Sequence, residues 1–149
     1  MTAGPWLLTN GFRTNLANGN LGNLTASSAI RVALFTSSSN LGAASTTYNG
    51  ITNEVSNANG YTTGGVTGIQ LSASGTTSVT LTPTANIVWT ASASGIVAYF
   101  AAAYLYAAGV GANQYIVGYC LLDSTPASVT VSSGNTLTIS NSLPIITIA

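Results

Sequence analysis

The chain of 149 residues carries four charged side chains and no histidine, so 3% of it is charged, against roughly 25% in an ordinary soluble domain. Disorder does not explain this, because 46% of the residues are hydrophobic and disordered chains are poor in such residues. The length indicates one domain with a core of its own. A surface of Ser, Thr, Asn, Gln and Gly offers little repulsion between copies. This favours a protein that works packed against neighbours over a secreted or heat-resistant domain with a neutral surface.

The N-terminal segment, residues 1–23, combines an apolar cluster with a short helical pattern. Residues 10–17 predict one or two helical turns, and Asn-Gly pairs then end them. A segment this apolar must cover something: either its own domain or, as an arm, a neighbouring subunit. For the second alternative we predict an assembly interface formed by Trp6, Leu7, Leu8, Phe12 and Leu16. The segment lacks the basic start and long apolar core of a signal peptide, so we expect synthesis in the cytoplasm and retention there unless the protein leaves inside a particle.

The remainder, residues 24–149, has the pattern of an all-β domain. Residues 30–36 are apolar almost throughout, which predicts either a strand buried on both faces or a strand buried with an edge partner. Residues 37–53 are polar and predict an ordered surface loop, and turn signals follow at Asn59-Gly60 and Gly64-Gly65. Short strands are then expected at residues 69–73, 78–82, 86–90, 96–106, 115–122, 128–132, 136–140 and 145–148. We predict an antiparallel β-sandwich, jelly-roll-like, with about eight strands and a hairpin turn at Gly134-Asn135.

The central run WTASASGIVAYFAAAYLY, residues 89–106, permits a second interpretation as part of a membrane-spanning helix. Residues 95–112 are uncharged over the shortest length that suggests such a helix. However, no Lys or Arg flanks the run, it is rich in Ala, and Gly109 and Gly111 interrupt it. We therefore expect one long strand over residues 96–106, a turn at 109–113, and a returning strand. Residues 97, 99, 101, 103 and 105 should share one face, and residues 96, 98, 100, 102, 104 and 106 the other.

Few residues could carry chemistry. The charged groups are Arg13, Arg31, Glu54 and Asp123, and the lone cysteine is Cys120. Nothing in the spacing brings the two carboxylates together as a glycosidase pair, and each is expected to cap a turn or pair with an arginine. No His or Lys can activate a hydroxyl or the thiol, which is expected to be a small buried hydrophobe.

These absences exclude most classes of functional site. The ligands for a metal are missing, and residues 60–65 lack the Lys of a phosphate-binding loop. Two basic residues cannot neutralise a nucleic-acid backbone. We predict no enzymatic activity, no catalytic residue, no cofactor, no metal, and no nucleic-acid, membrane or small-molecule partner.

Several strings, in this order and spacing, resemble a family of small tailed-phage proteins encoded among virion genes. They are MTAGPW, RVALFTSSSN, TNEVSNANGYTTGG, VWTASASG, GYCLLD and SGNTLTI, and they cover most of the chain. The resemblance implies a β-sandwich component of the virion, either a capsid cement or decoration protein or a tail part. Relatives often carry Lys where this chain has residues 11–17, with Arg13 as its only basic residue there, which favours apolar docking of the segment.

Three structural roles follow as alternatives. The first, which we favour, is a capsid cement or decoration protein that bridges major capsid subunits and copies of itself in the virion. The second is a tail component such as a fibre, spike or adhesin-like module, with the loop at residues 37–53 facing a receptor. The third is an extracellular filament subunit that donates residues 1–8 or 144–149 as a strand to the next copy.

Overall fold

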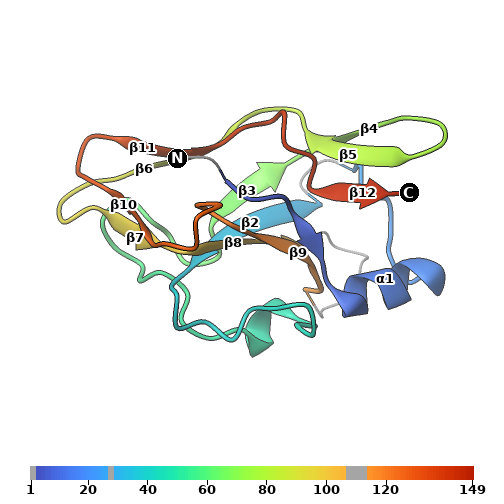
Figure 1. Ribbon diagram of the computed structural model, residues 1–149, viewed down its shortest axis with the longest axis horizontal. Coiled ribbons are helices and arrows are strands. Elements are labelled where there is room, and N and C mark those ends of the chain that lie inside the picture. The colour runs from blue at the N-terminus through green and yellow to red at the C-terminus, as the bar shows by residue number, and fades with distance from the viewer. Residues whose placement is uncertain (1–2, 27–28, 107–113) are drawn as a thin grey trace.

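The computed structural model describes residues 3–26, 29–106 and 114–149, which form one α-helix, one short 3-10 helix and twelve strands. The largest sheet has five strands, all paired antiparallel, in the order β1-β9-β8-β2-β3. Their bounds are Leu7–Leu8 for β1, Ile116–Leu121 for β9, Phe100–Leu105 for β8, Ile30–Phe35 for β2 and Val66–Ile69 for β3. The helix α1, Asn10–Ala17, follows β1 directly and lies beside β9 (Figure 1).

The second half of the chain forms one long, interrupted hairpin. Its outgoing arm is β5 (Val79–Pro83), β6 (Ile87–Thr90), β7 (Ile96–Ala98) and β8, and its returning arm is β9, β10 (Val129–Val131), β11 (Thr136–Ile139) and β12 (Ile146–Ile148). The strands pair in nested order: β8 with β9, β7 with β10, β6 with β11 and β5 with β12. The remaining strand, β4 (Leu71–Ser74), adds to the free side of β5.

The main core lies between the five-stranded sheet and the outer pairs of this hairpin. Val32 and Leu34 of β2 enter it from the sheet, and Ile87 and Trp89 of β6 enter it from the other side. Figure 1 shows β4, β5, β6 and β11 along one side of the molecule and the five-stranded sheet below them. Since each strand alternates, the inward residues are the apolar ones that the sequence pattern marks.

A second, smaller core covers the opposite, outer face of the five-stranded sheet. Phe35 and Tyr104 are buried there beneath the loop at residues 37–53, which contains the short 3-10 helix η1, Tyr48–Gly50. Figure 1 shows this loop below the sheet. Burial on both faces, one of the two alternatives for residues 30–36, is therefore confirmed for β2, Ile30–Phe35.

The predicted all-β, antiparallel fold class is confirmed, and so is a helical turn near the N-terminus. The expected number of about eight strands is too low, because the described residues form twelve. The layer facing the five-stranded sheet consists of separate sheets of two, two and three strands, so a jelly-roll-like sandwich of two continuous sheets stays an interpretation. The segment 1–23 contributes β1 to the largest sheet and is thus built into the same domain as residues 24–149.

The predicted single strand over residues 96–106 is wrong, because the chain changes sheets at Tyr99. The Tyr99 N–H donates to the Phe35 carbonyl, and the Tyr99 carbonyl accepts the Leu122 N–H. Strand β7 therefore ends before Tyr99, and β8 begins after it. The predicted faces hold within β8, where Ala101 and Ala103 face the main core, but they are exchanged in β7. The predicted turn at 109–113 falls outside the described residues. No helix among the described residues is long and apolar enough to cross a membrane.

Two further predictions fail where the chain changes partners. The strand expected at residues 69–73 is divided at Gln70, since β3 belongs to the five-stranded sheet and β4 to the three-stranded one. Gly134 and Asn135 do form a turn, closed by a bond from the Asn135 N–H to the Ser132 carbonyl, but not a hairpin. The flanking strands β10 and β11 pair with β7 and β6 instead of with each other.

Candidate functional site

The side chain of Glu54 is positioned by the edge of β2. The short strand β3 pairs only with the first half of β2. Residues 53–55 complete that edge: the Val55 N–H donates to the Leu34 carbonyl at 2.9 Å, and Glu54 bridges Phe35. Directly opposite residues of an antiparallel pair share a face, so Glu54 lies on the outer face with Phe35.

The Glu54 carboxylate is surrounded by hydrogen-bond donors. Tyr61 donates its hydroxyl to Oε1 at 2.5 Å and the Gly64 N–H donates to the same oxygen at 2.7 Å. Tyr48 donates its hydroxyl to Oε2 at 2.5 Å. The Tyr61 oxygen in turn accepts the Leu34 N–H at 3.0 Å. We call Glu54, Tyr48, Tyr61, Gly64 and Tyr104 the Glu54 cluster. Its hydrogen bonds connect the loop at residues 37–53, and the turns that follow it up to residue 65, to the five-stranded sheet.

The tyrosines of the Glu54 cluster are held in their protonated form. Tyr48 stacks on Tyr104 with ring centroids 4.3 Å apart, and Tyr104 donates its hydroxyl to the Gly64 carbonyl at 2.8 Å. Burial, and second the bond to Glu54, raises the pKa of both Tyr48 and Tyr61 above its usual range. Burial likewise raises the pKa of Tyr104. Phenols that are protonated and already bonded are poor proton-transfer groups near neutral pH, so the cluster is suited to fixing a loop.

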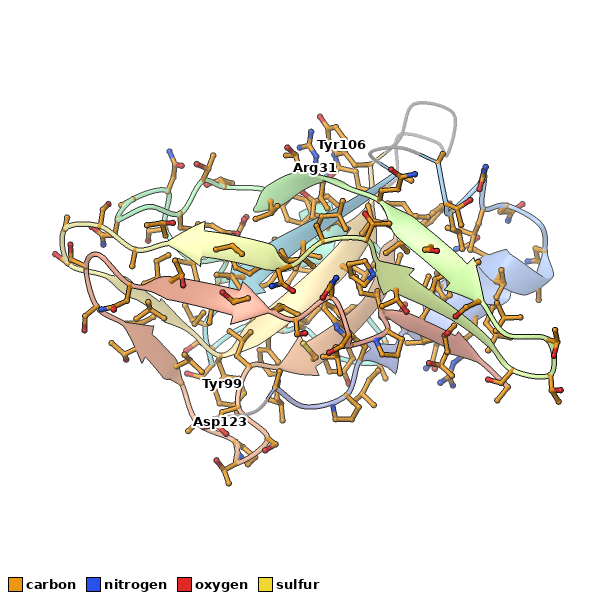
Figure 2. The ribbon with its side chains drawn as sticks, turned by 90° about the horizontal axis from the view of Figure 1, so that it is seen from above. Arg31, Tyr99, Tyr106 and Asp123 are labelled. Carbon is orange, nitrogen blue, oxygen red and sulfur yellow. The ribbon has the colours of Figure 1, made fainter. Side chains whose placement is uncertain are left out.

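Of the other charged groups, Arg31 adjoins the Glu54 cluster through a hydrogen bond to Tyr104, whereas Asp123 lies apart from it. Figure 2 shows Arg31 against the Tyr106 ring, 3.0 Å from its centroid, and Asp123 beside Tyr99 at the opposite edge of the view. Asp123 accepts both the N–H and the hydroxyl of Thr125, and so caps a turn as predicted. Within the described ranges, no group of three or more His, Cys, Asp and Glu side chains could hold a metal ion.

Cys120 lies in the main core, as predicted. It is fully buried on β9, and burial raises the pKa of its thiol to about 12. A thiol of this kind holds too little thiolate near neutral pH to act as a nucleophile.

Of the five predicted interface residues, four pack against the protein's own core. Phe12 is completely buried, and Trp6, Leu8 and Leu16 are partly buried against the same core. The local reason is the capping residue Thr9: its hydroxyl accepts the Phe12 N–H and donates to the Ile116 carbonyl at 2.7 Å, which fixes the start of α1 to β9.

Leu7 is the exception among the predicted residues, with 51% of its surface exposed. It lies opposite Tyr119 in the register of β1 and β9, and Tyr119 lies opposite Ala102 of β8. Tyr119 packs edge-on against Phe100 with ring centroids 6.3 Å apart. Leu7, Phe100, Tyr119 and Leu121 thus form an uncharged row of exposed and half-buried side chains across the outer face, which we call the outer-face strip.

Sequence reasoning missed three of the four residues in the outer-face strip. The signal was present in the apolar character of residues 115–122, which exceeds what one buried face requires. No family model matches the chain, and comparisons with curated proteins and with solved structures find no match either.

Proposed function

We propose that the protein is a non-enzymatic structural component of a tailed-phage virion. Its role is that of a capsid cement or decoration protein, which stabilises the particle by bridging major capsid subunits. The proposal is supported by the sequence resemblance and by the nearly uncharged surface.

The observation that carries the proposal is the outer-face strip. Protein interfaces are enriched in aromatic residues and depleted of charge at their centres. The strip has this composition, because Phe100 and Tyr119 lie half-buried beside the exposed Leu7 and no charged residue belongs to it. It also lies on a rigid support, since β8 and β9 are central strands of the largest sheet. Docking through it relies on shape and apolar contact, and electrostatic steering contributes little.

The experiment compares retention of two variants on purified particles. Leu7→Glu places a charge in the outer-face strip, and Val97→Glu is the matched control, because Val97 is similarly exposed, at 49%, on β7. Wild type and Val97→Glu should stay bound through washes of rising salt, whereas Leu7→Glu should be lost. Both variants should keep the wild-type melting temperature. Release of the wild type by moderate salt alone, or equal retention of both variants, contradicts the proposal.

One observation favours the tail as a second candidate location. The loop at residues 37–53 is held in a defined shape by Asn40, whose side chain donates to the Gly50 carbonyl at 3.0 Å and accepts the Thr52 N–H at 2.8 Å. A hollow of about 230 Å³ lies beside it, lined by uncharged residues. A loop ordered in this way could contact a receptor. Immunogold labelling of particles separates the two locations, because a cement protein labels the head and a tail component labels the tail only.

The filament alternative receives less support. The N-terminal strand β1 pairs with β9, and the C-terminal strand β12 pairs with β5. Both segments that could be donated to another copy are therefore paired within their own chain.

A further inference from the structure

The returning arm of the long hairpin has an open edge at β11. Strands β10 and β11 each belong to a two-stranded sheet, with β7 and β6 as their only strand partners among the described residues. Open edges of this kind are templates for pairing with another chain, and proteins usually guard them with Lys, Pro or bulges. The chain contains no Lys, and no charged residue lies between residues 124 and 149. The part of this edge that the structure describes therefore carries neither a charge nor a proline.

The register shows which backbone groups this edge offers. The Ala91 N–H donates to the Asn135 carbonyl at 2.9 Å, where Asn135 continues the pairing of β11 with β6. In an antiparallel pair, hydrogen-bonded positions alternate with positions whose backbone groups point away. Leu137 therefore bonds to β6, and the N–H and C=O groups of Thr136 and Thr138 point to the open side.

A hollow of about 490 Å³ lies along this edge. Its walls include Thr136 and Thr138, and Val131 and Leu137 of the main core lie beneath it. Ala3, in the segment that precedes β1, also lines the hollow. The space beside the edge thus gives access to backbone groups and apolar side chains, which are the two elements that an added strand uses.

Another open edge lies at β4. The three-stranded sheet has the order β12-β5-β4, so one side of β4 is unpaired within the described part of the chain. The Thr84 N–H donates to the Gln70 carbonyl at 3.0 Å, which fixes the alternation. In the pairing of β4 with β5, Ser72 therefore occupies a hydrogen-bonded position, and the backbone N–H and C=O groups of Ala73 point away from β5 to the open side. Pro83, at the end of β5, lies opposite Leu71 at a position without hydrogen bonds between the two strands. This agrees with the alternation, because proline has no N–H to donate.

The open edges of β11 and β4 lie at opposite ends of the molecule. Figure 1 shows β10 and β11 at one end and the hairpin of β4 and β5 projecting at the other. Residues 72–78 are exposed, and no charged residue lies between residues 55 and 122. Both edge strands are four residues long.

We propose that β4 of one copy pairs with β11 of a second copy. The contact joins the two-stranded sheet of one copy to the three-stranded sheet of the next, which gives a five-stranded sheet β6-β11-β4-β5-β12 across the interface. A second copy suits the edge because both strands are uncharged and unguarded, with matching length and exposed Ser and Thr. The contact is heterologous, so it builds a ring or an open chain of copies. It does not depend on the proposed virion function.

Two proline variants test the pairing on the purified protein. Thr138→Pro removes an outward N–H from β11, and Ala73→Pro removes one from β4. Proline is tolerated on edge strands where the N–H faces solvent, so both variants should fold. If a proline variant fails to fold, Thr138→Lys or Ala73→Lys is used at the same position, because a lysine on an edge strand opposes pairing with another chain. Thr147→Lys is the control, because Thr147 is exposed on β12, outside both edges.

The readout is sedimentation velocity over a range of protein and salt concentrations. Wild type and Thr147→Lys should associate with rising concentration, almost independently of salt. Each edge variant should weaken association about tenfold or more. An equimolar mixture of Thr138→Pro and Ala73→Pro should form dimers and no larger species, because each variant retains the edge that the other has lost. A wild type that stays monomeric, edge variants that associate normally, or a mixture that forms no dimer overturns the proposal.

Discussion

Tyr61 donates its hydroxyl to Glu54 at 2.5 Å while its own oxygen accepts the Leu34 N–H, so one phenol connects the carboxylate to the backbone of β2. The bond from Leu34 to Tyr61 gives the buried Leu34 N–H a partner at a point where β3 no longer pairs with β2. Unpaired buried N–H groups are costly, which explains why an aromatic residue from a distant turn is held there.

Replacement of this carboxylate by an amide should reduce stability. In Glu54→Gln the amide nitrogen cannot accept the bonds that a carboxylate oxygen accepts, and at least one charge-assisted bond is lost. We expect the free energy of unfolding to fall by about 1–3 kcal/mol, measured by urea denaturation. The control is Asp123→Asn, the same chemical change at the turn that ends β9, which should cost less than about 1 kcal/mol. Equal losses in the free energy of unfolding for both variants would show that the hydrogen bonds of the Glu54 cluster stabilise the fold no more than the turn bonds of Asp123 do.

Alkaline pH should destabilise the protein through the buried tyrosines. Burial raises the pKa of Tyr48 and Tyr61 above the ordinary value of 10.0. Above about pH 10 the unfolded chain therefore releases phenol protons that the folded protein retains, which favours unfolding. Their contribution to stability is complete below pH 10 and is lost progressively above it. Tyr48→Phe should show a shallower decline of the urea midpoint above pH 10 than wild type does.

The thiol of Cys120 should add an earlier phase to this decline. Burial raises its pKa from the ordinary value of 9.0 to about 12, so the unfolded chain begins to lose this proton near pH 9. Stability attributable to the thiol is complete below pH 9 and disappears between pH 9 and 12. In Cys120→Ala, we expect the urea midpoint to stay level from pH 8 to pH 10, while that of wild type already falls. A decline of the same size in both proteins over that interval would argue against the assignment.

Much of the fold could be predicted because local patterns decide it. The alternating strands at residues 78–82, 86–90, 128–132 and 136–140 are present, with bounds shifted by no more than one residue at either end. The two changes of sheet, at Gln70 and Tyr99, could not be predicted, because neither position has the Gly or Pro that usually marks a break. At Tyr99 the deciding interactions are bonds to Phe35 and Leu122, which are distant in sequence.

The Glu54 cluster could not be predicted either. Tyr48 and Tyr61 lie six and seven residues from Glu54, a spacing that matches no helical face or turn, and Tyr104 is distant in sequence. The N-terminal segment is a different case, since its apolar residues were identified correctly and the alternatives of core and interface stayed open. The register of β1 with β9 distinguishes Leu7, which stays exposed, from Phe12, which is buried.

Gly65 should tolerate no side chain. Its φ is +72°, and a Cβ atom would overlap the Val32 carbonyl oxygen and lie 2.6 Å from the Ala33 Cα. Gly65→Ala should therefore lower the free energy of unfolding by at least about 3 kcal/mol. Gly19→Ala is the control, because Gly19 has a similar φ of +68° with nothing within 4 Å of the added Cβ, and it should cost about 1 kcal/mol. Similar losses for both would mean that backbone strain alone, without close approach to β2, sets the requirement.

The N-terminal segment should divide into a structural part and an exposed part. Phe12→Ala leaves a cavity in the main core beside β9, and we expect it to cost about 3–5 kcal/mol in urea denaturation. Leu7→Ala removes a side chain that is 51% exposed, and its cost should stay below about 1 kcal/mol. If the outer-face strip binds a partner, the same variant, Leu7→Ala, should also weaken retention of the protein on particles while its melting temperature stays unchanged. A large loss of stability in Leu7→Ala would assign Leu7 to the fold, and the outer-face strip would then lose its most exposed member as a docking residue.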